Sequence, residues 1–352
     1  MSDNTIQKLR RALHAVPERS GAEIKTRALL MEFLRTRTTL ELHPCGGGFY
    51  AAHREASGSS IALRADYDAL ALPDGSAAHL CGHDGHAAAL CGVALAIEGR
   101  QLGRDVFLLF QPAEETGQGA EGCLELFRRE RVDAIYGAHN LPGYPLGQIL
   151  TRPGTFACAS RGLSLSFQGR AAHAAYPENG VSPAPAVGRL LCALPELAAP
   201  GRYTGMTLCT VIGASMGEKA FGAAAAQAEV WLTLRAEHDR DLEGLQRAIL
   251  ALAQSLAEQS RLVFAFQLQD VFPATENHPE HAQKVLALEG AQLLPAPMRW
   301  SEDFGRYLQS CPGAFFGIGA GECCPPLHTD GYEYPDALLP AAIDAFLKLL
   351  QS

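Results

Sequence analysis

Apolar residues recur through the first forty positions at the spacing of helices that bury one face. Leu9, Leu13 and Val16 share a face, Pro17 ends that pattern, and a second helical pattern covers residues 22–36. We therefore expect the chain to begin with two helices packed as a hairpin.

Short apolar runs of the kind that form buried strands follow at residues 61–63, 106–110 and 134–136. A helical pattern at residues 86–98 separates the first two runs. Apolar runs that alternate with helices predict an α/β layer, with a largely parallel central sheet flanked by helices.

Polar side chains that can bind metals or move protons come directly after these runs. They are Asp66, Glu114, Glu115 and His139. Because open α/β sheets bind ligands beyond the carboxyl ends of their strands, we expect these groups to gather at one edge of the sheet.

A different pattern begins near residue 161, where apolar and polar residues alternate as in half-buried strands. The elements predicted there are strands at 163–167, 207–212, 228–235 and 262–268 and helices at 184–197 and 241–259. Their β-α-β-β-α-β order predicts a ferredoxin-like insert. After Pro273 the α/β pattern returns, and it ends in a helix at 335–351. We expect a discontinuous domain of residues 1–160 and 275–352, with an inserted domain of residues 161–274.

The composition of the chain is that of a globular protein, with 352 residues of which 47% are apolar and 19% charged. A formal net charge of −9 argues against nucleic-acid binding, which depends on Lys and Arg. The amino terminus has a charged helical pattern rather than an apolar secretory core. The longest apolar stretch, residues 87–97, is about half the length that a membrane span requires. We therefore expect a cytoplasmic protein that binds neither membranes nor nucleic acid.

The ten cysteines include no CxxC pair, so a disulfide framework is not indicated. Cys323 and Cys324 are adjacent, a geometry that rarely permits a bridge between them. We expect most cysteines to be reduced. Four of them are interpreted as small buried apolar residues, namely Cys45, Cys91, Cys192 and Cys209.

Two motifs carry candidate chemistry, CGHDGH at residues 81–86 and QPAEE at residues 111–115. Thiol, imidazole and carboxylate groups are the ligands of a borderline-soft divalent metal. The spacing of Cys81 and His83 puts both side chains on one side of an extended or loop segment. Two adjacent glutamates can offer one carboxylate to a metal and the other, as a base, to a water. Taken singly, these residues would equally suit core histidines or a solvated acidic turn.

The chain resembles the M20 metallopeptidase family, in the subgroup of aminoacylases, N-acetyl-diaminopimelate deacetylases, hippurate hydrolases and indole-3-acetyl-amino-acid hydrolases. The pairing of CGHDGH with QPAEE is the most specific part of the resemblance. The matching segments are residues 9–21 (LRRALHAVPERSG), 64–70 (RADYDAL), 81–86, 110–120 (FQPAEETGQGA), 169–177, 301–304 and 327–329.

The resemblance implies a site for two divalent metal ions. Its ligands would be Cys81, His83, Glu115, His139 and His328. Zinc suits the Cys and His ligands, whereas manganese, cobalt or nickel also suit mixed imidazole and carboxylate positions. The resemblance also implies that Glu114 is the general base and that Asp66 orients a ligand imidazole. His173 would steady the substrate oxyanion, and Arg235 and Asn277 would lie near the substrate carboxylate.

The family's activity implies hydrolysis of an N-acyl amino acid to a carboxylic acid and a free amino acid. The inserted domain would be a lid through which two copies form a homodimer. A dipeptidase or carboxypeptidase uses the same amide chemistry and stays open as an alternative. Two rivals lie outside this chemistry: a cysteine hydrolase with Cys81 as nucleophile and His83 or His86 as base, and a noncatalytic binding module.

The chain departs from the subgroup in the predicted lid, where residues 222–226 read GAAAA instead of an Asn-Val-Ile-Pro stretch. This departure removes an Asn and a rigidifying Pro from a segment that faces substrate in relatives. Leu80 also replaces a common Ala before Cys81. The implied metal ligands are intact, so the departures bear on the choice of substrate.

Overall fold

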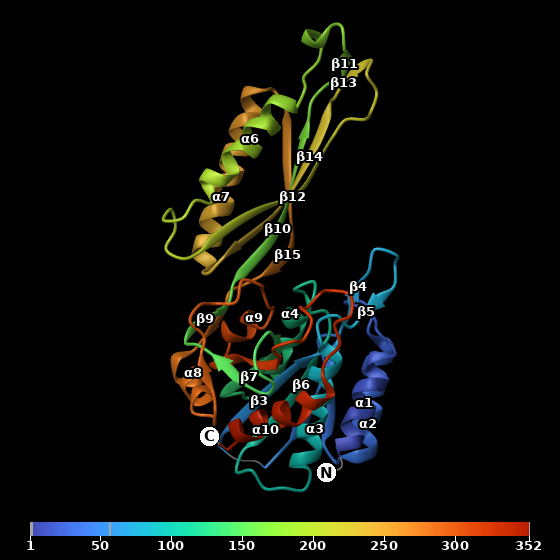
Figure 1. Cartoon of the computed structure of the whole chain (residues 1–352), viewed down its shortest axis with the longest axis vertical. Helices are drawn as coiled ribbons and strands as arrows, with labels where there is room; N and C mark the ends of the chain where they lie inside the picture. The colour runs from blue at the N-terminus through green and yellow to red at the C-terminus, as the bar shows by residue number, and fades with distance from the viewer. Residues whose placement is uncertain (1–2, 56–57, 352) are drawn as a thin grey trace. The chain divides into compact units, whose positions relative to one another are not determined.

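The computed structural model describes residues 3–55 and 58–351. The chain forms two compact units (Figure 1). The first combines Met1–Phe156, Thr275–Pro297 and Glu302–Ser352, and the second combines Ala157–Ala274 with Met298–Ser301. None of the described helices is both long and apolar enough to cross a membrane.

The first unit is built on an eight-stranded mixed sheet with the order β1-β2-β6-β3-β7-β18-β8-β17. Its four central strands are parallel: β6 (Asp105–Gln111), β3 (Ser60–Asp66), β7 (Ala134–Pro142) and β18 (Gly313–Gly321). Every residue of β3 is buried, as expected for a strand covered on both faces. The parallel centre agrees with the prediction from the apolar runs.

The edges of this sheet differ from the prediction because they contain antiparallel pairs. Strands β1 (Glu41–Cys45) and β2 (Gly48–His53) form a hairpin whose second strand pairs antiparallel with β6. At the other edge, β8 (Ile149–Thr151) is antiparallel to β18 and parallel to β17 (Gln292–Leu293). These strands have only two to six residues, so their sequences lack a clear strand pattern.

Helices α1 (Asp3–His14), α2 (Ile24–Arg37), α3 (His83–Ile97) and α10 (Leu339–Leu349) lie together beside the sheet (Figure 1). Their apolar side chains form one core with the sheet, and α3 is buried along almost its whole length. The two predicted helices are confirmed as α1 and α2, and both pack on α3. Helix α8 (Pro279–Leu286) packs on β8 and β18. The short helices are α4 (Gly119–Cys123), α5 (Glu125–Arg129) and α9 (Gly305–Leu308).

The second unit has the element order β-α-β-β-α-β and a four-stranded antiparallel sheet, β12-β14-β10-β15. The elements are β10 (Ala159–Gln168), α6 (Ala184–Leu197), β12 (Thr207–Met216), β14 (Gln227–Ala236), α7 (Asp239–Gln259) and β15 (Val263–Phe272). Helices α6 and α7 pack on the sheet and bury a separate apolar core. A small hairpin pairs β11 (Ala172–His173) with β13 (Ala223–Ala224).

Two predicted boundaries near the candidate ligands were wrong. Helix α3 begins at His83 instead of residue 86, and β7 continues to Pro142 instead of ending near residue 136. The longer strand results from its pairing with β18, in which His139 lies opposite Gly317. His139 therefore lies within a strand and not after it.

The cysteine interpretation also needs correction. Cys45 and Cys91 are buried, as expected, but Cys192 is exposed and Cys209 is partly exposed. Cys192 lies on α6, whose outer face is solvated, and Cys209 lies on β12 at the edge of its sheet. Helix and strand periodicity indicates two faces, but it does not say which face another element covers.

Candidate metal centre

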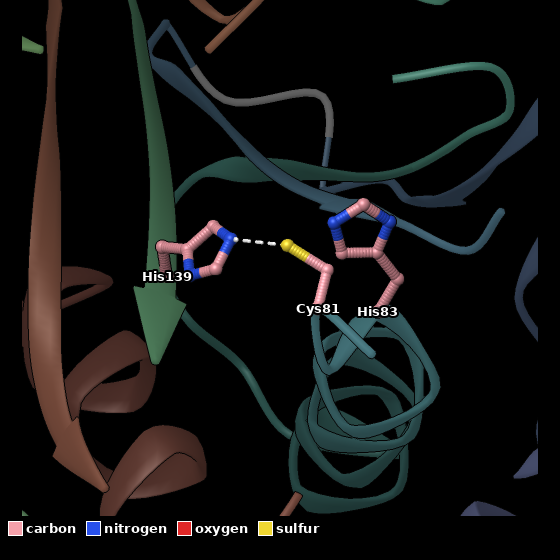
Figure 2. A group of neighbouring side chains, drawn as sticks. All are labelled: Cys81, His83 and His139. Carbon is pink, nitrogen blue, oxygen red and sulfur yellow. Dashed lines mark hydrogen bonds between the residues drawn. The ribbon is translucent and has the colours of Figure 1, made fainter. Parts of the chain in front are cut away.

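The segment that carries Cys81 and His83 turns sharply into α3. Gly82 precedes the helix with a φ of 95°, a left-handed conformation that favours glycine. A Cβ atom at this position would lie 2.4 Å from Oδ1 of Asn140, so no larger residue fits there. His83 thus occupies the first turn of the helix, and Cys81 lies just before it (Figure 2).

Two histidines from distant segments meet the sulfur of Cys81. Nε2 of His139 lies 3.4 Å from Sγ and Nε2 of His328 lies 3.3 Å from it. Figure 2 shows His139 extending from β7 toward Cys81. The backbone N–H of His328 donates to the carbonyl oxygen of Leu80 at 2.8 Å, which holds the carboxy-terminal loop beside the thiol. His328 has a φ of 60°, an uncommon value for a non-glycine residue, and such strain is frequent at functional sites.

The loop after β6 brings both glutamates to the same place. Ala113 also has a positive φ, 53°, and its N–H donates to Oε1 of the buried Glu23 at 2.8 Å. Oε1 of Glu115 lies 3.8 Å from Nε2 of His83 and 3.6 Å from Nε2 of His328. Oε2 of Glu114 lies 4.0 Å from the same His83 nitrogen.

These groups have the chemistry that a divalent metal ion requires. Three sets have their ligand atoms within 4.8 Å of one another, namely Cys81–His83–His139, Cys81–Glu115–His328 and His83–Glu114–Glu115. Within the described part of the chain, Nε2 of His83 and Oε1 of Glu115 are buried and have no hydrogen-bond partner. Buried polar atoms are rarely left unpaired, and a bound cation would satisfy both. The sulfur, nitrogen and oxygen donors therefore fit zinc and similar ions.

Burial also determines the charge state of these groups in the protein without metal. Burial, followed by the charge of Glu115, raises the pKa of the Cys81 thiol well above its usual range. Burial likewise raises the pKa of Glu115 to about 7. Burial and the neighbouring carboxylates Glu302 and Asp303 raise the pKa of Glu114. A cation among these groups would favour their ionised forms, because opposite charges stabilise each other strongly in a buried site.

Asp68 is a site residue that the sequence reasoning missed. Its Oδ1 accepts a hydrogen bond from Nδ1 of His83 at 2.9 Å. Its Oδ2 accepts from the hydroxyl of Ser20 at 2.7 Å and from the backbone N–H of Glu115 at 3.0 Å. The signal was present in the RADYDAL segment, where Asp68 follows Asp66 by two positions.

Asp66 was expected to orient a ligand imidazole, but its hydrogen bonds go elsewhere. Its carboxylate accepts from Nη1 of Arg64 at 2.6 Å and bonds Nδ1 of His86 at 2.6 Å. The distance from Asp66 Oδ2 to Nε2 of His83 is 3.9 Å. The residue that bonds the His83 ring is therefore Asp68, because Asp66 is the last residue of β3 and Asp68 follows in the loop that approaches α3.

A buried ionic network lies against Glu114 and was also missed. Nη2 of Arg64 lies 2.8 Å from Oδ1 of Asp303 and 3.0 Å from Oε1 of Glu302. The backbone N–H of Asp303 donates to Oε1 of Glu114 at 3.3 Å. The acidic residues of this network lie in the SEDF segment at residues 301–304, and nothing in the sequence indicates that this segment contacts Arg64.

Two of the predicted site residues belong to the second unit. His173 is exposed on β11, and its Nδ1 accepts a hydrogen bond from the N–H of Ala175 at 3.1 Å. Arg235 donates from Nη1 to Oγ of Ser301 at 2.8 Å and to the carbonyl oxygen of Arg299 at 3.2 Å. Residues 223–226 of the departing segment line a cavity of about 530 Å³ within this unit.

Asn277 lies in the first unit and is buried. Its Nδ2 donates to Oγ1 of Thr151 at 3.1 Å, to the carbonyl oxygen of Arg152 at 3.0 Å and to that of Phe315 at 2.8 Å. Its Oδ1 accepts from the N–H of Phe315 at 2.6 Å. These hydrogen bonds use both polar atoms of the amide to hold β16 (Thr275–Asn277) against β18.

A mixed α/β sheet with thiol, imidazole and paired carboxylate groups at the carboxyl edge of its parallel strands is typical of metal-dependent hydrolases. The family model for Peptidase family M20/M25/M40 matches residues 62–352. The chain therefore belongs to this family.

Individual relatives span nearly the whole chain. An N-acetyl-L-cysteine deacetylase of Bacillus subtilis is 28% identical over 332 residues, which cover 88% of this chain and 79% of the relative. An N-acetyldiaminopimelate deacetylase of Exiguobacterium sibiricum is 26% identical over 358 residues, 96% of each chain. The solved structure of a dinuclear metal binding peptidase from the M20 family of Bacillus subtilis superposes with a TM-score of 0.82 at 24% identity. The superposition covers 99% of this chain and 97% of the peptidase, and so supports the fold.

Proposed function

We propose that this protein is a metal-dependent amidohydrolase that converts an N-acyl amino acid to a carboxylic acid and a free amino acid. The observation that carries the proposal is the convergence of the Cys81 thiol, the Glu115 carboxylate and the His328 imidazole within 4.8 Å, with Glu114 beside them. The deacetylase names of the relatives favour an N-acyl amino acid as substrate. They favour this activity over the dipeptidase alternative.

The proposed cofactor is a pair of divalent metal ions held by the five predicted ligands, Cys81, His83, Glu115, His139 and His328. The thiol and imidazole donors make zinc the first choice, and manganese, cobalt and nickel remain alternatives. When bound, the ions would polarise the amide carbonyl and lower the pKa of a water from about 15.7 toward about 7.

Glu114 is the proposed general base. It neighbours the proposed ligand Glu115 in the chain, and the N–H of Asp303 orients its carboxyl group. Glu114 would take the proton from the attacking water and later deliver it to the leaving amine. A raised pKa suits both steps, because it makes the carboxylate a stronger base toward the water while the resulting acid can still give the proton to the leaving amine.

His173 is the proposed donor to the oxygen that becomes negative during the reaction. Because Nδ1 of His173 accepts a hydrogen bond, the proton of the neutral ring is on Nε2, which can donate. Loss of one such donor typically lowers the rate by about 10²–10³. Arg235 is proposed to bind the carboxylate of the amino-acid part.

The inserted domain, residues 161–274, is proposed as a lid through which two copies form a homodimer. Strand β12 is at the edge of the antiparallel sheet, so one side of its backbone has no partner strand in the described chain. Val211 and Ile212 on this strand are exposed. Exposed apolar edge strands readily pair with a second chain.

A cysteine hydrolase is less consistent with the site. A nucleophilic cysteine requires a thiolate, which forms where the pKa of the thiol is lowered. Burial raises the pKa of Cys81, and Glu115 raises it further. A bound cation would itself stabilise the Cys81 thiolate, whereas a nucleophile would have to form it without that help, so the environment suits a metal ligand better.

The deciding experiment combines metal removal with a substrate panel. The protein is stripped with EDTA, reloaded with each of the four metals, and assayed on acetyl, benzoyl and indolyl-acetyl amino acids and on dipeptides. We expect EDTA to abolish hydrolysis and a metal to restore it, with the N-acyl amino acids cleaved faster than dipeptides. Activity that survives EDTA would favour the cysteine hydrolase, and no hydrolysis with any metal would favour a binding module.

A further inference from the structure

Two cysteines outside the proposed metal site lie against each other. Cys45 is the last residue of β1 and Cys123 is the last residue of α4, and both are 1% exposed or less. The thiol of each one donates to the carbonyl oxygen of the other at 3.5 Å. These reciprocal hydrogen bonds join segments that are 78 positions apart in the chain.

The backbones beside the two thiols are in direct contact. A Cβ atom on Gly46, next to Cys45, would lie 2.0 Å from the carbonyl carbon of Gly122, next to Cys123. Glycine at both positions therefore permits an approach that other residues would prevent. A disulfide requires the two cysteines to lie close together. The backbone contact and the reciprocal thiol hydrogen bonds bring Cys45 and Cys123 side by side, and we infer that a disulfide can form between them without a large movement.

We propose that Cys45 and Cys123 form an oxidation site, a dithiol that a peroxide converts reversibly to a disulfide. In the first step one sulfur attacks a peroxide oxygen, which breaks the O–O bond and gives a sulfenic acid and water. In the second step the other sulfur attacks the sulfenic sulfur, the S–S bond forms and a second water leaves. Two thiols thus lose two hydrogens and two electrons, and one hydrogen peroxide is reduced to two waters. This site is independent of the proposed amidohydrolase activity.

Burial determines how fast the pair reacts. A peroxide reaches the sulfurs only when the structure opens locally. Strand β1 is the edge strand of its sheet, and α4 has five residues, so we expect these elements to open at a lower free energy than the central strands. We expect slow oxidation in buffer that accelerates at urea concentrations below the unfolding transition.

The crosslink would also affect the segment that follows the proposed base. Helix α4 begins four residues after Glu115, and the N–H of Ala120 in α4 donates to Oδ2 of Asp303 at 2.9 Å. A disulfide at Cys123 would tie this helix to the edge hairpin. Closing a loop this long raises the unfolding temperature by about 5 °C.

Peptide mapping of the metal-loaded protein tests the proposal. The protein is treated with hydrogen peroxide, the remaining thiols are alkylated in denaturant, and the digest is analysed by mass spectrometry. We expect a disulfide-linked peptide that contains Cys45 and Cys123, which dithiothreitol separates, together with the rise in unfolding temperature. Cys45→Ser and Cys123→Ser should each abolish the linked peptide. The control Cys192→Ser, at an exposed thiol of α6, should leave its yield unchanged.

The wild-type protein alone can overturn the proposal. Peroxide in mild urea that oxidises Cys192 but leaves Cys45 and Cys123 alkylated would show that the pair does not form a disulfide. A disulfide between Cys323 and Cys324, with none between Cys45 and Cys123, would also show that the proposed pair does not form. Because mapping needs no variant, a serine variant that fails to fold does not affect this outcome.

Discussion

Nδ1 of His83 donates a hydrogen bond to Oδ1 of Asp68 at 2.9 Å, and this contact determines how the His83 ring faces the proposed metal site. A carboxylate can only accept, so Nδ1 carries a proton, and in the neutral ring that a metal requires the lone pair is on Nε2. Nε2 is the nitrogen that lies near Glu115. Oδ2 of Asp68 also accepts from the N–H of Glu115, so one carboxylate orients two of the proposed ligands.

Asp68→Asn should therefore weaken metal binding. The amide is a poorer acceptor for the imidazole N–H, and loss of such a partner typically lowers metal affinity about 10- to 100-fold. Metal content after dialysis against buffered zinc gives the affinity. Asp74→Asn, in an exposed turn, is the matched control and should bind metal as the wild type does. Unchanged affinity in Asp68→Asn would show that the contact does not orient His83.

Glu114→Gln should keep its metal and lose nearly all turnover. Glutamine has the same shape but cannot accept a proton, and a general base typically contributes about 10²–10⁴ to the rate. Hydrolysis of an N-acetyl amino acid measures kcat, and elemental analysis measures the metal. Glu121→Gln, on the same segment and exposed, should retain full activity. A Glu114→Gln protein with normal kcat would remove this residue from the mechanism.

Metal binding should release a proton from Cys81. Burial raises the pKa of this thiol, so it is protonated at neutral pH, whereas a metal binds the thiolate. Calorimetric titration of the metal-free protein in buffers of different ionisation enthalpy counts the protons. Wild type should release about one proton more than Cys81→Ser. Equal proton release by the two proteins would mean that the thiol does not bind the metal.

His14 should make stability depend on pH. The hydrogen bond to Asp84 raises the pKa of His14, and burial opposes this effect only in part. A raised pKa means that the pair stabilises the folded state below the ordinary histidine pKa. The stabilisation is then lost as the pH rises through the folded-state value. His14→Gln should lower the free energy of unfolding more at about pH 5 than at about pH 9.

Urea denaturation at each pH measures the effect of His14→Gln, and the Asp84→Asn protein is the reference background. In that background the same substitution should have no pH-dependent effect, because the partner charge is gone. If His14→Gln still lowers the free energy of unfolding in a pH-dependent way in the Asp84→Asn background, the pH dependence comes from another group.

The local pattern was sufficient for much of the fold. The helices α1, α2, α6 and α7 and the central strands β3, β6 and β7 were predicted, because each has a periodic apolar face. The strands β1, β2 and β18 were missed, since glycine and short length hide their periodicity. The end of β7 was wrong for a related reason, because its last residues become strand only through pairing with β18.

The candidate site was likewise predicted from the sequence only in part. The CGHDGH and QPAEE motifs indicated donors of the right chemical types. Asp66 ends one predicted strand, and Glu114 and Glu115 follow another. Asp68 was missed although it lies in the RADYDAL segment, and the burial of Arg64 among three carboxylates was not predictable. A side chain's partner depends on which segments meet, and Arg64 meets Asp303 across 239 positions of chain.

Local sequence was enough to indicate the kinds of donor and the elements that carry them, because helix and strand periodicity and turn glycines depend on neighbouring residues. That His328 reaches Cys81 across 247 positions and that Asp68 bonds His83 became clear from the folded protein alone. Such contacts depend on the packing of the whole unit: a local pattern fixes backbone conformation but carries no information on which distant segment will lie beside it.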